Sequence, residues 1–184
     1  ASRELQLRAS RRLRQKHGTF FTGTTLSARL LRRAALPAQK QIFYDPTCGM
    51  GDLLLAAARR LPLASDLQKT LELWWGKLAG TDLQPEFIDG TKARLILLAQ
   101  QRLGKNEIYN GSTSNLFPQI KIGDGLLESK AYQQATTLLM NPPFGLTPAP
   151  VGCTWAGGRV SLAATFMVTA LEKIESGSEV LAIL

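Results

Sequence analysis

Two adjacent prolines directly after an apolar run constrain the fold of this chain more than any other feature. Residues 135–140 read ATTLLM, which is typical of a buried strand, and Asn141-Pro142-Pro143-Phe144 follows at once. Neither proline has a backbone N–H to donate to a neighbouring strand, so the strand ends there. Asn141 is therefore expected at the carboxyl end of a strand, which is the edge of an open α/β sheet where ligands bind.

These four residues have the chemistry to hold a planar group that carries an amine. The Asn141 amide and the neighbouring carbonyl groups offer hydrogen-bond acceptors, and Phe144 offers an aromatic face. The other interpretation is a plain turn after a core strand. The tetrapeptide by itself leaves both interpretations open.

A second segment has the order strand, glycine turn, helix. Residues 41–44 form a short apolar strand, residues 45–52 read DPTCGMGD, and an apolar helical stretch covers residues 53–61. This order is typical of nucleotide-like cofactor sites, because glycines let the backbone approach the ligand and helix N–H groups point at it. The third glycine of the dinucleotide fingerprint and the GK[ST] of a P-loop are both missing from this segment.

Together the motifs make the chain similar to the S-adenosylmethionine-dependent DNA methyltransferases that act on amino groups. The resemblance is to the N6-adenine enzymes of the γ motif order, which serve in restriction-modification. In that family an aromatic–threonine motif precedes the glycine motif, and NPPF or NPPY follows later. Residues 18–23 here read GTFFTG, with Gly23 in the place of the usual proline. The resemblance covers about residues 16–184.

Strands and helices alternate along the chain, which predicts an α/β fold with a doubly wound, mostly parallel sheet. By resemblance this is the Rossmann-like methyltransferase fold with strand order 3-2-1-4-5, and the last two of the usual seven strands are missing. The expected strands cover residues 41–45, 78–82, 120–123, 137–140 and 179–184. The expected helices cover about residues 2–15, 24–35, 51–61, 66–77, 85–103 and 160–175.

The resemblance implies a cofactor site for S-adenosylmethionine at the strand ends. Asp82 ends the second strand, where the family has an acidic residue for the ribose hydroxyls, and Asp124 ends the third, where an acidic residue reads the adenine amino group. The alternatives are a helix N-cap for Asp82 and a turn aspartate for Asp124. The implied cofactor-binding residues are Phe21, Thr22, Asp45, Pro46, Thr47, Cys48, Gly49, Gly51, Asp82, Leu83, Asp124, Gly125 and Asn141.

The resemblance also implies catalysis by Asn141, Pro142, Pro143 and Phe144 on the N6 amine of adenine in DNA. Hydrogen bonds from N6 to the Asn141 side-chain oxygen and the Pro142 carbonyl free the nitrogen lone pair to attack the sulfonium methyl. Phe144 stacks on the adenine after it has flipped out of the duplex. Cys48 and Cys153 have neither metal-ligand spacing nor the Pro-Cys pair of a cytosine-C5 enzyme, so no metal and no thiolate nucleophile are expected.

The net charge of +8 is concentrated at the N-terminus. Residues 1–40 hold ten Lys or Arg and one acid, which gives +9, and the remainder holds twelve basic and thirteen acidic residues, which gives −1. Contact with DNA phosphates is the functional interpretation. A solvated helix face or the stub of a missing domain is the alternative. The expected organisation is a basic helical segment over residues 1–16 and a catalytic domain over residues 17–184.

The length of 184 residues and the hydrophobic share of 45% predict one globular domain with a sizeable core. No signal peptide or membrane-spanning run is evident, so a cytoplasmic location without a membrane partner is expected. The chain closes on the apolar run of residues 179–184, which suggests truncation at the C-terminus. No target-recognition domain is evident, and any specificity or restriction subunits are expected outside this fragment.

Three other functions compete with this one. The same chemistry serves methyltransferases that act on an RNA base or on a protein glutamine amide, which also carry NPPF or NPPY. A non-catalytic cofactor-binding assembly module is a second possibility. A nicotinamide dehydrogenase is disfavoured by the missing G-x-G-x-x-G.

Overall fold

Five short apolar segments form one parallel sheet in the order β3-β2-β1-β4-β7. The computed structural model describes residues 22–37, 40–104, 107–109, 111 and 115–184. The strands of the sheet are β1 (Phe43–Asp45), β2 (Leu78–Asp82), β3 (Ile120–Ile122), β4 (Thr137–Met140) and β7 (Glu179–Ala182). The predicted fold class and the predicted order 3-2-1-4-5 are confirmed, because β7 is the fifth strand of the prediction.

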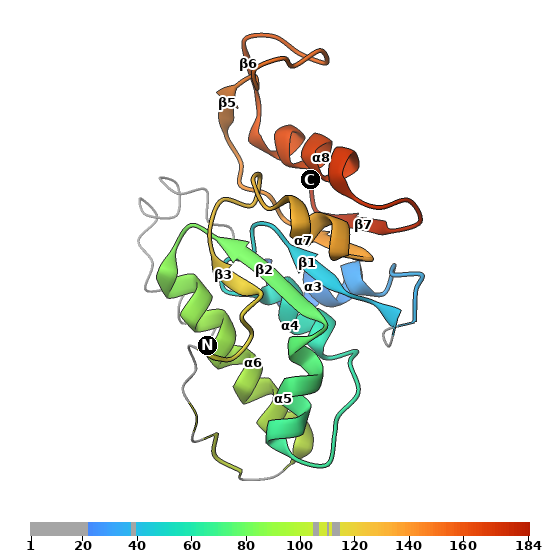
Figure 1. Cartoon of the computed structure of the whole chain (residues 1–184), viewed down its shortest axis with the longest axis vertical. Coiled ribbons are helices and arrows are strands. Elements are labelled where there is room, and N and C mark those ends of the chain that lie inside the picture. Colours follow the sequence, from blue (N-terminus) through green and yellow to red (C-terminus); the bar gives the residue numbers. More distant parts are fainter. Residues whose placement is uncertain (1–21, 38–39, 105–106, 110, 112–114) are drawn as a thin grey trace.

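Helices connect the strands and cover both faces of the sheet (Figure 1). They are α3 (Thr24–Leu31), α4 (Asp52–Ala58), α5 (Leu67–Trp75), α6 (Pro85–Leu103), α7 (Ser129–Gln134) and α8 (Leu162–Lys173). The bounds predicted for β2, β4 and the helix over residues 85–103 agree with the structure. The predicted basic helix over residues 2–15 lies outside the described residues.

Three elements were not expected from the sequence. The six-residue helix α7 lies in a polar stretch without apolar periodicity. A separate antiparallel hairpin pairs β5 (Leu146–Pro148) with β6 (Arg159–Ser161), and each of its strands is only three residues long.

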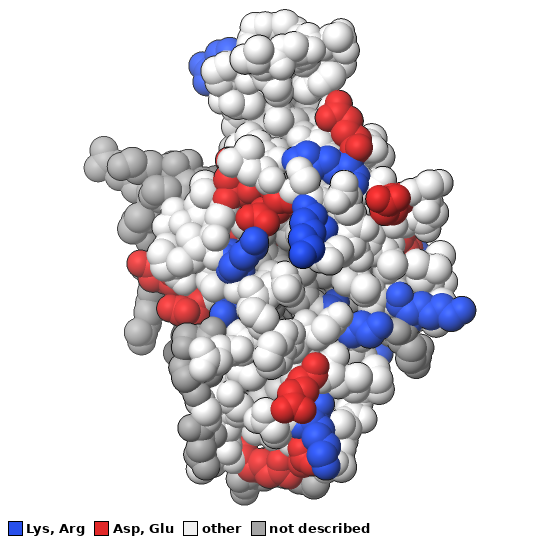
Figure 2. All heavy atoms as spheres, viewed as in Figure 1, with Lys and Arg blue, Asp and Glu red and all other residues white. Residues whose placement is uncertain are grey.

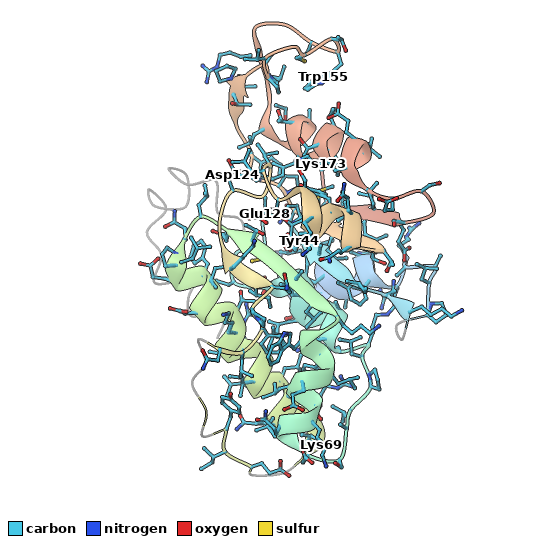
Figure 3. All side chains as sticks on the ribbon, in the orientation of Figure 1. Tyr44, Lys69, Asp124, Glu128, Trp155 and Lys173 are labelled. Atoms are coloured by element: carbon cyan, nitrogen blue, oxygen red, sulfur yellow. The ribbon has the colours of Figure 1, made fainter. Side chains whose placement is uncertain are left out.

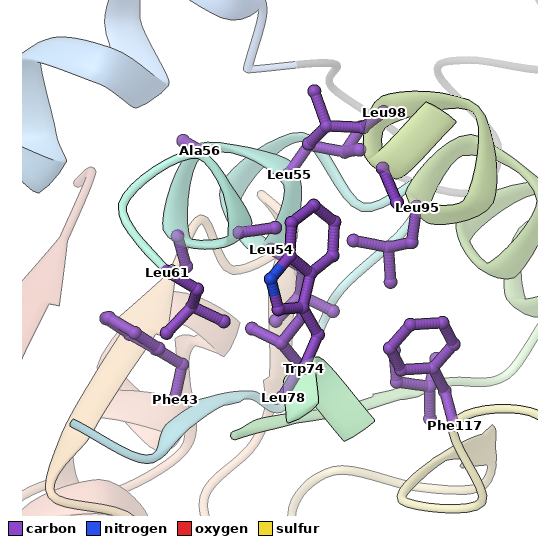
Figure 4. Close-up of a cluster of buried hydrophobic side chains, with 14 of the residues drawn as sticks. Phe43, Leu54, Leu55, Ala56, Leu61, Trp74, Leu78, Leu95, Leu98 and Phe117 are labelled. Atoms are coloured by element: carbon purple, nitrogen blue, oxygen red, sulfur yellow. The ribbon is translucent and has the colours of Figure 1, made fainter. Parts of the chain in front are cut away.

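The core is divided by the sheet into two clusters, because successive strand residues point to opposite faces. Phe43 of β1 packs with side chains of α4, α5 and α6, whereas the next residue, Tyr44, packs with α7 and α8. Figure 4 shows the first cluster around Trp74, whose ring lies among Leu54, Leu61 and Leu78. The central strands β1 and β4 are buried at every residue, which explains the continuous apolar run of β4, whereas β3 at the edge exposes Lys121 and Ile122.

The second cluster connects α8 to the carboxyl end of the sheet. Tyr44 and Tyr132 meet edge to face with ring centroids 5.1 Å apart. The Lys173 ammonium lies 5.6 Å from the centre of the Tyr132 ring and donates to the Leu126 carbonyl at 2.7 Å. Burial raises the pKa of both phenols, so they stay protonated. These contacts hold the turn after β3 against α7 and α8.

Candidate functional site

The carboxyl ends of β1, β2, β3 and β4 surround a cavity of about 410 Å³. In the sheet, β2 lies on one side of β1 and β4 lies on the other side. The cavity therefore lies where the strand order of the sheet reverses direction. Its lining residues are Pro46, Thr47, Gly49, Asp82, Leu83, Gln84, Phe87, Gly123, Asp124, Gly125, Leu126, Asn141, Pro143, Thr147, Leu162 and Phe166. Nine of the residues predicted from the sequence are among them: Pro46, Thr47, Gly49, Asp82, Leu83, Asp124, Gly125, Asn141 and Pro143.

The glycine turn between β1 and α4 forms one wall of the cavity. Gly51 has φ of 77° and precedes the first helical residue, Asp52. A Cβ at Gly51 would lie 2.6 Å from the Thr91 side chain, and the Thr91 hydroxyl donates to the Gly49 carbonyl at 2.9 Å. By contrast, a Cβ at Gly49 would meet no atom within 4 Å. The turn is therefore packed against α6 at Gly51 and open at Gly49.

Asp82 joins this turn to the start of α6. One carboxylate oxygen accepts the Gly49 N–H at 2.9 Å, and the other accepts the Gln84 N–H at 2.9 Å. One oxygen thus binds the glycine turn, and the other binds the N-cap residue of α6. Each oxygen keeps a lone pair that can accept a further hydrogen bond. Burial raises the pKa of Asp82, and the two N–H donors oppose that rise.

Asp45 lies behind the cavity wall. Its side chain is 1% exposed and accepts the Thr47 N–H at 3.0 Å. Burial raises the pKa of Asp45 to about 8; the Thr47 N–H opposes the rise, and the neighbouring Asp82 carboxylate adds to it. Burial therefore favours the protonated form of Asp45 to a higher pH than for an exposed carboxyl.

The turn after β3 forms a further wall of the cavity. Asp124 accepts the Leu126 N–H at 3.0 Å, which is the local hydrogen bond of a turn aspartate. Gly125 is buried against the glycine turn, and a Cβ there would lie 2.0 Å from the Pro46 carbonyl oxygen. Only glycine lets these two turns approach so closely.

Asn141 follows β4 and forms the opposite wall. Its side-chain nitrogen donates to the Thr22 hydroxyl at 3.0 Å, which connects the residue of the aromatic–threonine motif to the NPPF motif. Pro142 is buried behind the wall and Pro143 lines the cavity. Phe144, the next residue along the chain, is 52% exposed and does not line the cavity.

Several predicted residues lie behind or beside the lining residues. Cys48 is buried, its N–H donates to the Thr81 carbonyl at 2.9 Å, and its side chain packs on Gly80. Burial raises the pKa of the Cys48 thiol, which disfavours a thiolate. Phe21 lies outside the described residues. The predicted residues that do not line the cavity are Thr22, Asp45, Cys48, Gly51, Pro142 and Phe144.

The sequence did not predict the wall of the cavity that α8 and the hairpin contribute. Phe166 and Leu162 come from α8, and Thr147 comes from β5. Phe87 of α6 lies near the start of that helix. The α8 stretch was predicted as a helix, but its sequence gives no signal of which residues face the strand ends. With Leu83 and Pro143, these side chains make the cavity suitable for a flat ring.

A second cavity of about 410 Å³ lies against α3, α4 and α6. It is lined by arginines, apolar side chains and Asp52, and it contains none of the predicted site residues. No group of three or more His, Cys, Asp or Glu with the placement of metal ligands occurs in the described ranges. Within those ranges, no helix combines the length and apolar character needed to cross a bilayer.

The chain matches a known protein family in sequence and several known structures in fold. The family model for N-6 DNA methylases matches residues 4–150. No curated protein matches the chain in sequence. In fold, the chain is similar to the M protein of the type I restriction enzyme EcoKI, with a TM-score of 0.58 and 19% identity over 89% of this chain and 34% of that protein.

Two larger proteins contain a similar fold. The type IIG restriction endonuclease BpuSI gives a TM-score of 0.60 at 19% identity, over 93% of this chain and 20% of that protein. DrdV, solved in complex with DNA, gives 0.57 at 16% identity, over 88% of this chain and 20% of that protein. The chain thus spans about a third of the EcoKI M protein and a fifth of the other two. Because the family model covers most of its length, the chain belongs to the N-6 DNA methylase family.

Proposed function

We propose that this chain transfers a methyl group from S-adenosylmethionine to the N6 amine of adenine in DNA, as the modification part of a restriction-modification system. One observation carries the proposal: Asn141 of the NPPF motif lies in the same cavity as Gly49 and Asp82. A catalytic amide and a cofactor-binding turn must share one cavity for direct methyl transfer.

The residues of the cavity fit S-adenosylmethionine. Gly49 leaves open space where a side chain would stand, so the methionine part of the cofactor can approach the turn. The Asp82 carboxylate has remaining acceptor capacity for the ribose hydroxyls. Leu83 and Phe166 offer apolar faces to the adenine ring, and Asp124 offers an acceptor for its amino group.

When bound, S-adenosylmethionine supplies a methyl group on a positively charged sulfur. The Asn141 side-chain oxygen and the Pro142 carbonyl would accept hydrogen bonds from the substrate amine, which favours a tetrahedral nitrogen whose lone pair can bond to the methyl carbon. The methyl–sulfur bond would break as this bond forms, S-adenosylhomocysteine would leave, and the nitrogen would lose one proton. The hydrogen bond from Asn141 to the Thr22 hydroxyl orients the amide for this task. No thiolate is involved, in agreement with the raised pKa of Cys48.

The substrate adenine has to leave the duplex to reach Asn141. Flipping costs a few kcal/mol, and an aromatic contact returns about 1–3 kcal/mol per base. Phe144, which is 52% exposed and follows the cavity-lining Pro143, would supply this contact by stacking on the flipped base.

The wider organisation is part of the same proposal. Residues 17–184 are assigned to the catalytic domain and residues 1–16 to a basic segment that contacts DNA phosphates. DNA is the partner, and specificity or restriction subunits or domains lie outside this chain. A cytoplasmic location follows from the proposed substrate.

The decisive experiment identifies the methylated product. The full-length protein is incubated with S-adenosylmethionine and with DNA, RNA or protein in separate reactions, and products are digested and analysed by mass spectrometry. N6-methyladenine in DNA supports the proposal. Methylated RNA or methylglutamine alone would move the chain to the corresponding alternative, and cofactor binding without any transfer would make it a non-catalytic module.

A further inference from the structure

A two-stranded hairpin projects from the body of the molecule directly after Phe144. Strands β5 and β6 pair antiparallel, with Thr147 opposite Val160, and the Ala149 N–H donates to the Gly158 carbonyl at 2.8 Å. Residues 149–158 close the tip. In Figure 1 the hairpin stands beyond α8, clear of the central sheet. We call residues 145–161 the arm.

The base of the arm is part of the rim of the cavity. Thr147 of β5 and Leu162, the first residue of α8, both line the cavity that contains Asn141. The Leu162 N–H donates to the Gly145 carbonyl at 2.9 Å, which fixes the two ends of the arm to each other. The arm therefore rises directly beside the cavity that contains Asn141.

The arm carries no negative charge. From residue 141 to residue 170 the chain has no Asp or Glu, and Arg159 is the single charged residue. In Figure 2 the projection is white apart from one blue group at its edge. Nothing on the arm therefore repels a polyanion, whereas the lining of the cavity includes Asp82 and Asp124.

Large apolar side chains of the arm are exposed. Figure 3 labels Trp155 at the tip. Trp155 is 41% exposed, Leu146 is 61% exposed and Val151 is fully exposed. Strand alternation turns Thr147 and Val160 inward, and Leu146 lies on the solvent side beside Arg159, whose guanidinium donates to the Leu146 carbonyl at 3.1 Å. A lone two-stranded hairpin is marginally stable in water, so a bound partner that covers these side chains stabilises it.

We infer that the arm holds the DNA duplex beside the flipped adenine, with Trp155 packed on a base and Arg159 paired with a phosphate. The inference rests on the proposed function. A flipped base stays covalently attached to its strand, so the duplex has to lie against the rim from which the arm rises. A two-stranded ribbon has the width to enter a DNA groove, and an aromatic ring stacks on any base.

A matched pair of tryptophans provides the test. Trp75 on α5 is 37% exposed, close to the value for Trp155, but α5 lies at the end of the molecule opposite the arm (Figure 1). The full-length protein and its Trp155→Ala, Arg159→Ala and Trp75→Ala variants are titrated with a duplex that holds one adenine opposite an abasic site, with S-adenosylhomocysteine present. Cofactor affinity, measured without DNA, shows that each variant is folded.

Trp155→Ala is expected to weaken DNA binding about tenfold without changing its salt dependence. Arg159→Ala is expected to flatten the slope of log affinity against log salt by about 0.9, the value for one phosphate contact. Trp75→Ala is expected to leave both unchanged. Hydrogen exchange of the wild type is expected to slow over residues 145–161 when DNA is added.

The inference is overturned if both arm variants bind DNA with wild-type affinity and DNA does not slow hydrogen exchange over the arm. That result leaves the proposed methyl transfer intact. A protected arm in a protein that methylates no DNA overturns the proposed function and retains the arm as a DNA contact. A change of oligomeric state in Trp155→Ala, with DNA affinity unchanged, assigns the arm to a protein interface and also overturns the inference.

Discussion

Replacing Gly125 by alanine tests whether the two turns at the strand ends form one cofactor site. The added Cβ would lie 2.0 Å from the Pro46 carbonyl oxygen, whereas carbon–oxygen contacts begin at about 3.3 Å. The turns therefore have to separate by about 1.3 Å. Gly125 has no left-handed backbone conformation in this structure, so the effect comes from this contact alone.

The expected cost is that of overpacking a well-packed site, about 1–3 kcal/mol. If the wall of the cavity moves by this amount, affinity for S-adenosylhomocysteine falls about 5- to 150-fold, and the melting temperature falls by about 2–4 °C per kcal/mol. Titration calorimetry and thermal unfolding measure the two quantities separately.

Gly123→Ala is the matched control, two residues away in the same turn. Its Cβ would meet only the ends of the Glu128 and Thr81 side chains at 3.2 Å, so a small effect on both quantities is expected. Unchanged cofactor affinity in Gly125→Ala, with a lowered melting temperature, would refute the assignment of this turn to the cofactor site. No change in either quantity would refute the close packing itself.

Three further substitutions probe the acids and the cysteine of the site. Asp82→Asn is expected to weaken cofactor binding by about 1.5–3 kcal/mol, because a charged acceptor is lost, and calorimetry measures it. The pKa of Asp45 is about 8 in the folded protein and 3.8 in the unfolded chain. Between these pH values the folded protein binds one more proton than the unfolded chain. The free energy of unfolding should therefore fall as pH rises, by up to about 1.4 kcal/mol per pH unit. In Asp45→Asn, urea unfolding from about pH 5 to about pH 8 should lack this contribution, and an unchanged pH profile would contradict it. Cys48→Ser is expected to leave methyl transfer within about twofold, since burial raises the thiol pKa and no thiolate acts.

The part of the fold that follows from local pattern was predictable. The apolar run before Asn141 ends at two prolines, so the end of β4 was placed correctly. The α6 bounds follow from Pro85 at the first helical position and Gly104, with φ of 64°, at the end. The six-residue α7 and the three-residue strands of the arm have no comparable signal, since so few residues show no periodicity.

The candidate site was predictable where its residues stand at strand ends. The glycine turn, Asp82 and Asn141 meet because parallel strands present their carboxyl ends at one edge. Phe166 was missed because its helix reaches the cavity only through the crossover from β4 to β7. The burial of Asp45 was also not predictable, because its surroundings come from β2 and the turn as well as from β1.

The most direct test of the central claim is single-turnover transfer of a labelled methyl group to adenine in DNA by wild type and Asn141→Ala. We expect labelled N6-methyladenine with the wild type and a rate about 10²–10³-fold lower with Asn141→Ala, because one preorganised acceptor at the reacting nitrogen is lost. Affinity for S-adenosylhomocysteine should change much less, since Asn141 acts on the substrate amine. Transfer at the wild-type rate by Asn141→Ala, or its abolition by Cys48→Ser, would contradict amino-group methylation at this site.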